Sequence, residues 1–191
     1  MTSADLTDAY FSIEIDPEYR TFLCFSWRKQ YYVFKVLPFG LASAPRIFTK
    51  LLKPVFDWFR QQGIRCSYYI DDSLCLNQTF ASCVRDTKRM TDKLEVLGFS
   101  INYEKSVLQP SQRIIFVGVI IDTVQFKVFL TQENNDKIKT SCKRVIENHC
   151  NTIRTLASLM GLIIHAFNAV TYDQLHYRNL ERDKIKHLRI N

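Results

Sequence analysis

Two adjacent carboxylates lie in the stretch Ser67-Tyr68-Tyr69-Ile70-Asp71-Asp72-Ser73-Leu74-Cys75-Leu76. Both flanks are short and rich in apolar or aromatic residues that favour strands, whereas Asp71, Asp72 and Ser73 favour turns. The pattern predicts a tight β-hairpin with the acids at its tip. Two like charges at one tip repel each other unless a cation neutralises them, and Mg²⁺ is bound through one or two carboxylates plus substrate phosphates. A solvated Asp-Asp turn is the alternative, and a third acid on a neighbouring strand would favour the metal site.

Asp5 is the candidate for that third acid. It lies within Ala4-Asp5-Leu6, which is typical of the end of a strand, and residues 7–11 follow as a turn or short helix. Neighbouring strands are about 4.8 Å apart, so a strand carrying Asp5 beside the hairpin would bring the carboxylates within reach of two shared metal ions. Such a site suits in-line phosphoryl or nucleotidyl transfer. Because little of a domain precedes Asp5, we expect the sequence to be a fragment.

Composition indicates a folded protein with a basic surface. The chain has 191 residues, is 47% hydrophobic and carries a formal net charge of +7. This length and apolar content allow a sizeable core, and the positive charge favours a polyanionic partner. The six cysteines form no C-x-x-C pair, so we interpret them as reduced core residues. No apolar run reaches the length of a membrane span and no signal peptide is present, so we expect an intracellular protein, cytoplasmic or nuclear.

One helix is predicted with particular clarity from Ser43, a potential N-cap, to Gly63. Its expected buried face follows helical spacing and consists of Ile47, Leu51, Leu52, Val55, Phe56 and Phe59. A second helix is expected from Thr79 to Leu97, closed by Gly98.

The remaining pattern alternates strands and helices. Strands are expected over residues 21–26, 30–36, 99–103, 114–121 and 126–130, and helices over 135–148 and 152–170. We therefore expect an α+β fold, an antiparallel sheet backed by two helices, with a boundary near Leu130 and a helical region after it. Residues 131–191 have a small excess of basic over acidic side chains, which is equally typical of a solvated face.

Several segments together resemble the successive motifs of a reverse transcriptase palm. They occur in that family's order and are residues 5–11, residues 37–48, Tyr69-Ile70-Asp71-Asp72, residues 98–106 and Phe116-Val117-Gly118. The form Pro38-Phe39-Gly40 resembles retrotransposon enzymes. Residues 44–50 and 153–161, with Leu175-His176-Tyr177-Arg178, are most similar to the DIRS-type group, whose elements integrate by a tyrosine recombinase.

The resemblance implies roles for the acids and their neighbours. Asp5, Asp71 and the backbone carbonyl of Leu6 would bind two Mg²⁺ ions, with Asp72 assisting and Mn²⁺ as a possible substitute. The backbone N–H groups of Asp8 and Ala9 would face the incoming triphosphate. Tyr10 would be the steric gate that excludes a ribose 2′-OH, although core packing alone would also explain an aromatic residue there.

The resemblance extends to the substrate-binding residues. Gly40 would lie against the nucleotide and Pro45 against the template, while Phe39 replaces a glutamine of retroviral enzymes. Lys105 matches a lysine that protonates the pyrophosphate leaving group, and an exposed turn lysine is the alternative. Phe116, Val117 and Gly118 would be the primer grip.

The implied organisation is a palm over residues 1–130, including a partial fingers hairpin at about 13–44, and a thumb-like region over 131–191. The implied function is an RNA-directed DNA polymerase that extends a DNA primer with dNTPs on an RNA or DNA template, without a membrane partner. The N-terminal fingers of the family would be missing. A catalytically inactive relic that binds nucleic acid is the alternative, and an RNA-directed RNA polymerase is a third reading.

Overall fold

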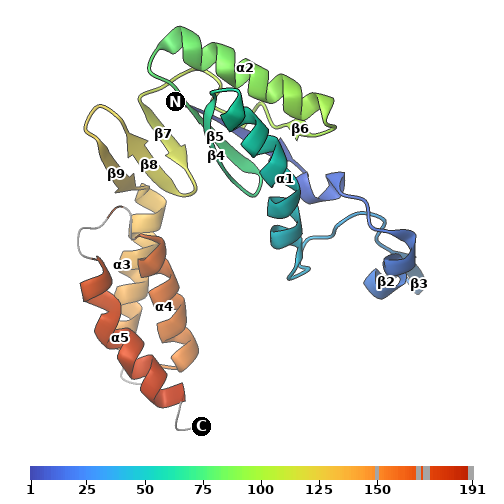
Figure 1. The fold of residues 1–191 in the computed structure, drawn as a ribbon. Helices are drawn as coiled ribbons and strands as arrows, with labels where there is room; N and C mark the ends of the chain where they lie inside the picture. The colour runs from blue at the N-terminus through green and yellow to red at the C-terminus, as the bar shows by residue number, and fades with distance from the viewer. Residues whose placement is uncertain (149–150, 167–168, 170–172, 189–191) are drawn as a thin grey trace. The chain divides into compact units, whose positions relative to one another are not determined.

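The computed structural model describes residues 1–191 except 149–150, 167–168, 170–172 and 189–191 (Figure 1). The chain forms two compact units, Met1–Ser111 and Gln112–Asn191. Each unit is described by itself. Among the described residues, no helix combines the length and apolar character needed to cross a membrane.

The first unit is built on a four-stranded sheet in the order β4-β5-β1-β6. Its strands are β1 (Thr2–Thr7), β4 (Arg65–Tyr69), β5 (Asp72–Leu76) and β6 (Ser100–Ile101). The pairings β4–β5, β1–β5 and β1–β6 are all antiparallel. The antiparallel sheet and the acidic hairpin predicted from the sequence are therefore confirmed, although Asp72 begins a strand and only Ile70 and Asp71 form the turn.

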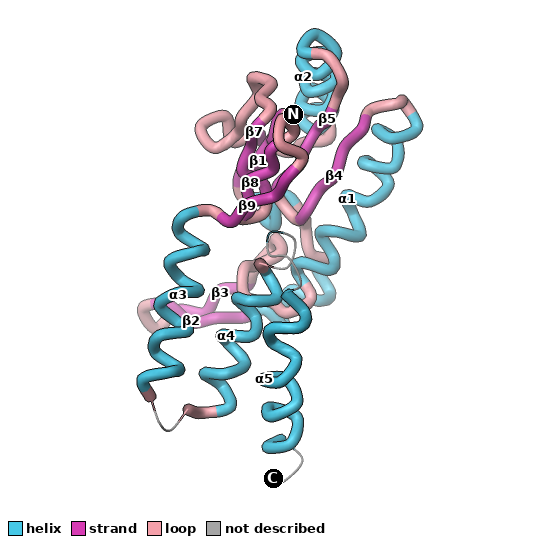
Figure 2. Tube along the Cα trace, turned by 90° about the vertical axis from the view of Figure 1, so that its left-hand side faces the viewer, coloured by secondary structure: helices cyan, strands magenta, loops and turns pink. Residues whose placement is uncertain are grey.

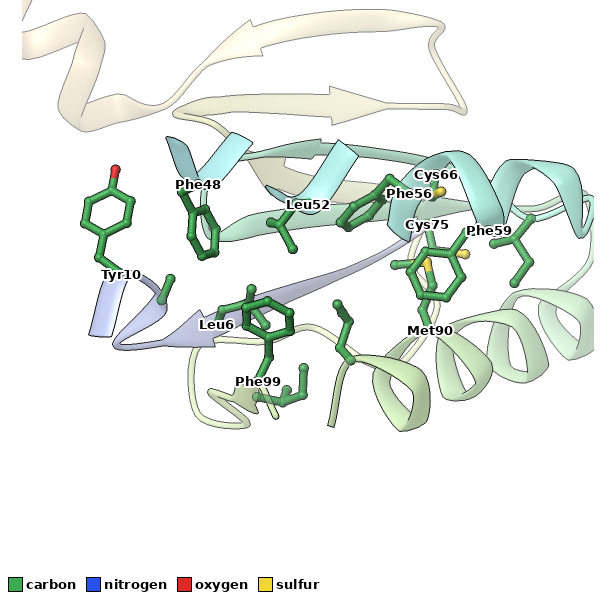
Figure 3. Close-up of a cluster of buried hydrophobic side chains, with 14 of the residues drawn as sticks. Leu6, Tyr10, Phe48, Leu52, Phe56, Phe59, Cys66, Cys75, Met90 and Phe99 are labelled. Atoms are coloured by element: carbon green, nitrogen blue, oxygen red, sulfur yellow. The ribbon is translucent and has the colours of Figure 1, made fainter. Parts of the chain in front are cut away.

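Two helices, α1 (Ala44–Gln61) and α2 (Phe80–Val96), pack against this sheet. In β1, Thr2, Ala4 and Leu6 are buried and alternate with the half-buried Ser3 and Asp5, as the two-residue period of a strand requires. Of these, Leu6 joins one hydrophobic cluster with side chains of both helices (Figure 3). One face of β1 thus belongs to the core, and Asp5 lies on the other.

The apolar face of α1 differs from the prediction. Ile47 and Leu51 are 41% and 42% exposed, so their assignment to the core was wrong. The buried row, each at most 1% exposed, is Ala44, Phe48, Leu52, Phe56 and Phe59. These positions lie four residues apart, or three from Phe56 to Phe59, and so form a single stripe that faces the sheet.

The second hairpin consists of β2 (Cys24–Trp27) and β3 (Gln30–Val33). Arg28 and Lys29 form its turn with φ values of 49° and 64°, as a type I′ turn requires. The strand expected from residue 21 begins only at Cys24. The preceding Pro17–Leu23 segment is a 3₁₀ helix whose first turn is capped by Asp16, which accepts a hydrogen bond from the backbone N–H of Glu18.

The second unit contains a three-stranded antiparallel sheet followed by helices that run side by side (Figure 2). Its elements are β7 (Arg113–Phe116), β8 (Val119–Asp122), β9 (Lys127–Leu130), α3 (Gln132–Glu147), α4 (Ile153–His165) and α5 (Asp173–Leu188).

Two predictions for this unit need correction, and one of its helices was not predicted. The single strand expected over 114–121 is two strands, because Val117 and Gly118 have φ values of 48° and 74° and turn the chain. The helix expected over 152–170 ends at His165, and residues 167–168 and 170 lie outside the described residues. Helix α5 was not predicted. The functional division near Leu130 into palm and thumb-like regions stays a prediction.

Candidate active site

The strand register of the first unit brings the three predicted acids together. Asp5 in β1 lies directly opposite Asp72 in β5. The backbone N–H of Leu6 donates to the backbone oxygen of Asp71 at 3.0 Å, which ties the hairpin turn to β1. Asp71 therefore occupies the turn beside Asp5, whereas Asp72 begins the neighbouring strand.

The turn that carries Asp71 is conformationally strained. Ile70 has φ 54°, a left-handed value that is uncommon for a β-branched residue and costs of the order of 1–3 kcal/mol. Its half-buried side chain packs against the core cluster of the first unit. This packing holds the turn in place and so fixes where the Asp71 carboxylate is presented.

A cavity of about 400 Å³ lies at this turn. The predicted site residues that line it are Asp5, Leu6, Asp8, Ala9, Tyr10, Asp71 and Lys105. Asp72 and Gly40 do not line it, although Phe39, next to Gly40, does. The structure thus gathers residues from β1, the segment after it, the hairpin turn and the turn after β6 around one space of a size typical of ligand sites.

Burial and mutual repulsion disfavour the charged form of two of these acids. The pKa of Asp5 is raised, chiefly by burial and then by the charge of Asp71, while Lys105 and a hydrogen bond from Asn102 act in the opposite direction. The pKa of Asp72 is raised by burial and by the charges of Asp71 and Asp5, with Lys105 again opposing. A cation placed among these oxygens would relieve both penalties.

This donor set fits a hard divalent ion held partly by substrate. No group of three or more His, Cys, Asp or Glu side chains in the described ranges is arranged to hold a metal by itself. Asp5 and Asp71 face the same cavity, however, and Mg²⁺ is commonly held by one or two carboxylates together with water and substrate phosphates. The carboxylates are therefore suited to an ion that arrives with a phosphorylated ligand.

Asp8, Ala9 and Tyr10 form one wall of the cavity. Asp8 has φ 48° and precedes a single 3₁₀ turn, Ala9–Ser12. Tyr10 is 9% exposed, with its ring centroid 5.1 Å from that of Phe39 and 5.5 Å from that of Phe48. Figure 3 shows Tyr10 at the edge of the hydrophobic cluster. Its ring is thus part of the core, as the simpler reading expected, and also lines the cavity.

A second, more apolar depression of about 520 Å³ lies on the other side of the hairpin turn. Ile70 lines both spaces, and the second also includes Pro45 and the exposed Tyr69. Three cations of α1 surround it, Arg46, Lys50 and Lys53. The predicted template residue Pro45 is therefore placed beside a basic stripe.

The predicted primer grip belongs to the second unit. Phe116 ends β7, and Val117 with Gly118 forms the β7–β8 turn. The side-chain amide of Asn134 in α3 donates to the backbone oxygen of Gly118 at 2.7 Å. This bond fixes the turn to the start of α3.

Four residues that line the first cavity were not predicted as site residues: Thr7, Phe39, Ile70 and Asn102. Thr7 and Ile70 adjoin predicted residues, so their positions in the motifs were the available signal. Asn102 is three residues before Lys105 in a turn, where asparagine commonly bonds to nearby backbone groups. That spacing could have identified it.

Comparison with known proteins identifies the family. Residues 1–121 match the family model described as reverse transcriptase (RNA-dependent DNA polymerase). The Pol polyprotein of equine infectious anemia virus is 35% identical over 81 residues, which covers 38% of this chain and 7% of that protein. The Gag-Pol polyprotein of koala retrovirus is 25% identical over 125 residues, covering 61% and 7%.

A plant virus protein and two solved structures agree with this match. The enzymatic polyprotein of cauliflower mosaic virus is 27% identical over 121 residues, covering 63% of this chain and 17% of that protein. A foamy viral protease-reverse transcriptase solved with double-stranded DNA superposes with a TM-score of 0.74 at 23% identity, covering 95% of this chain and 30% of that one. The same kind of protein solved with an RNA/DNA hybrid gives 0.71 at 23% identity, covering 97% and 24%.

These matches show both the family of the chain and how much of its relatives' length it covers. The chain spans only 7 to 17% of the length of these polyproteins. The structural likeness supports the predicted mixed α+β fold with antiparallel sheets. The chain belongs to the reverse transcriptase (RNA-dependent DNA polymerase) family.

Proposed function

We propose that this chain extends a DNA primer with dNTPs on an RNA or DNA template, using two Mg²⁺ ions for which Mn²⁺ can substitute. The observation that carries the proposal is that Asp5, Asp71, Tyr10 and Lys105 line the same cavity. Reverse transcriptases generally use divalent metal ions, and the buried, mutually repelling carboxylates of this cavity suit them.

Asp5, Asp71 and the backbone carbonyl of Leu6 would hold the ions. Once bound, two such ions activate the attacking hydroxyl and stabilise charge on the phosphoryl oxygens and the leaving group. Asp72 would assist from outside the cavity, and its absence from the lining supports the unequal roles of the two adjacent acids. Lys105, whose positive charge opposes the rise in the pKa of Asp5 and of Asp72, would donate a proton to pyrophosphate.

The wall of the cavity formed by residues 8–10 would receive the nucleotide. The backbone amides of Asp8 and Ala9 would bind the triphosphate, and Tyr10 would exclude a ribose 2′-OH. The two aromatic neighbours of Tyr10 support this role because they fix its ring in one position. Gly40 would approach the nucleotide through the adjacent Phe39, which lines the cavity.

The template would lie in the depression beside Pro45. Its apolar floor suits a base or sugar, and Arg46, Lys50 and Lys53 suit phosphates. Lys53 forms an exposed ion pair with Asp57 at 3.4 Å, which water screens strongly, so its charge stays available. Such contacts position a strand without reading its sequence.

Residues 131–170 would act as a thumb that follows duplex backbone, with Phe116, Val117 and Gly118 as primer grip. A hollow of about 270 Å³ between α3 and α4 is lined by Arg144 and Arg154, which supports contact with phosphates. The foamy viral relatives were solved with double-stranded DNA and with an RNA/DNA hybrid.

Residues 1–130 would be the palm with a fingers hairpin at about 13–44, and 131–191 the thumb-like region. Within the family we propose the DIRS-type group, on the sequence of residues 44–50 and 153–161.

The test is primer extension on an RNA template, with the 191-residue chain and with the longest protein its gene encodes, because the chain spans a small part of its relatives. We expect Mg²⁺-dependent incorporation of dNTPs that is lost in Asp71→Asn and kept in Asp92→Asn, an exposed acid of α2. Extension that survives Asp71→Asn would refute the assignment. Salt-dependent duplex binding without incorporation would favour the inactive relic, and preferential use of rNTPs would favour an RNA polymerase.

A further inference from the structure

The turn that follows β6, Asn102–Ser106, is tied to β1 through one residue that has no assigned role. Asn102 is half-buried and lines the cavity together with Asp5 and Lys105. Its position between a predicted metal ligand and a predicted proton donor raises the question of what its side chain does there.

We propose that Asn102 is a positioning residue that orients the Asp5 carboxylate toward the cavity and holds Lys105 beside it. The inference deepens the proposed polymerase function and rests on it. Asn102 acts through Asp5 and Lys105 and takes no part in the chemical step itself.

The hydrogen bonds of Asn102 determine which way its amide points. The backbone N–H of Lys105 donates to Asn102 Oδ1 at 3.2 Å. Because a backbone N–H only donates, this bond leaves the Asn102 NH₂ group for an acceptor, and the Asp5 carboxylate, which only accepts, lines the same cavity. Hydrogen bonding from Asn102 acts against the rise in the pKa of Asp5, in agreement with this orientation. Both ends of the amide are thus used, one on each functional residue.

The backbone reinforces this arrangement. The N–H of Asn102 donates to the backbone oxygen of Asp5 at 2.8 Å. Ser106 Oγ donates to the backbone oxygen of Asn102 at 2.6 Å and accepts from the backbone N–H of Asp5 at 3.0 Å. Asp5 is therefore held at its backbone and at its side chain by the same turn.

Neither aspartate nor serine reproduces both interactions. Aspartate has no N–H for Asp5 and would add a repelling charge, whereas serine could still accept from the Lys105 N–H but is too short to reach Asp5. Asn102→Ser therefore separates the two bonds, because it keeps the turn and removes only the contact with the carboxylate. Groups that orient metal-binding side chains typically change metal affinity or activity by about 10- to 100-fold when they are removed.

The experiment measures Mn²⁺ binding to the 191-residue chain by electron paramagnetic resonance, alongside thermal unfolding and the kcat and KM of primer extension. The variants are Asn102→Ser and Asn102→Ala, with Glu104→Gln as control because Glu104 is an exposed residue of the same turn that does not line the cavity. We expect Mn²⁺ affinity to fall about 10-fold in both Asn102 variants. We also expect kcat to fall more than dNTP affinity, and the control to match the wild type.

The outcomes separate this inference from the proposed function. Asn102→Ser with wild-type Mn²⁺ affinity overturns the positioning role alone, whatever its effect on thermal stability. A wild-type chain that binds no Mn²⁺ and extends no primer overturns both. Lower Mn²⁺ affinity in Asn102→Ser with an unchanged unfolding temperature supports the role, since a merely structural residue would change stability instead.

Discussion

Replacing Gly118 with alanine should destabilise the second unit by about 2 to 3 kcal/mol. Gly118 has φ 74°, and a non-glycine residue in the left-handed region costs roughly 1–2 kcal/mol. A Cβ atom added there would lie 2.9 Å from Asn134 Nδ2 and 2.8 Å from His165 Nε2. The Asn134 amide would have to move and weaken its hydrogen bond to Gly118, which is worth about 0.5–1.5 kcal/mol.

Gly98→Ala is the matched control for this change. Gly98 has φ 91° and a Cβ atom there would meet nothing within 4 Å, so only the backbone cost should appear. Both tryptophans, Trp27 and Trp58, lie in the first unit. In urea unfolding, tryptophan fluorescence should therefore report Gly98→Ala, and far-ultraviolet circular dichroism should report the loss in Gly118→Ala. The reasoning is refuted if Gly118→Ala costs no more free energy of unfolding than Gly98→Ala.

Two further predictions concern the first unit. Phe48 is fully buried against Tyr10, so Phe48→Ala should lower the free energy of unfolding by about 3–5 kcal/mol. The adjacent Ile47 is 41% exposed, so Ile47→Ala should lower it by less than about 1 kcal/mol. Equal losses in urea unfolding would contradict the observed buried face of α1. Asp5 and Asp72 have raised pKa values in the folded state, so the folded state binds more protons than the unfolded chain, and the contribution of these two acids to stability should increase as pH falls from neutral toward their unfolded pKa values near 4. In chelator at pH 7, Asp72→Asn should therefore be about 0.2–1 kcal/mol more stable to unfolding than the wild type, and this gain should disappear at low pH. A lower stability of the variant at pH 7 would refute the repulsion between the two acids.

The sequence predicted helix α1 but not which row of its side chains is buried. Ile47 and Leu51 are as apolar as their neighbours Phe48 and Leu52, so helical spacing alone allows either row to face the core. The sheet decides between them, because the larger Phe48 ring fills the space between Tyr10 and Phe99. Tertiary packing of this kind cannot be read from the periodicity of one helix.

The β7–β8 turn was missed for a different reason. Residues 114–121 form a nearly continuous apolar run, and Val117 is a β-branched residue that rarely adopts its observed φ of 48°. The turn is held by a hydrogen bond from Asn134, sixteen residues later in the chain. Local propensity opposes the turn, and only a contact distant in sequence explains it.

The proximity of the acids was easier to predict, because like charges this close together are unfavourable for folding alone. Asp5 lies directly opposite Asp72, and Ile70 is held in a left-handed conformation next to Asp71. Each feature costs free energy that the cluster around Phe48 has to offset. Residues that oppose folding in this way are explained if a bound ligand offsets their free-energy cost. A cation bound with phosphates would do so by neutralising the acids. Asn102, one of the lining residues that sequence reasoning missed, is favourable for folding: it accepts from the backbone N–H of Lys105, donates its own N–H to the backbone oxygen of Asp5, and so resembles an ordinary turn residue. Sequence reasoning thus finds the groups that carry charge into a site more readily than the neutral groups that hold them there.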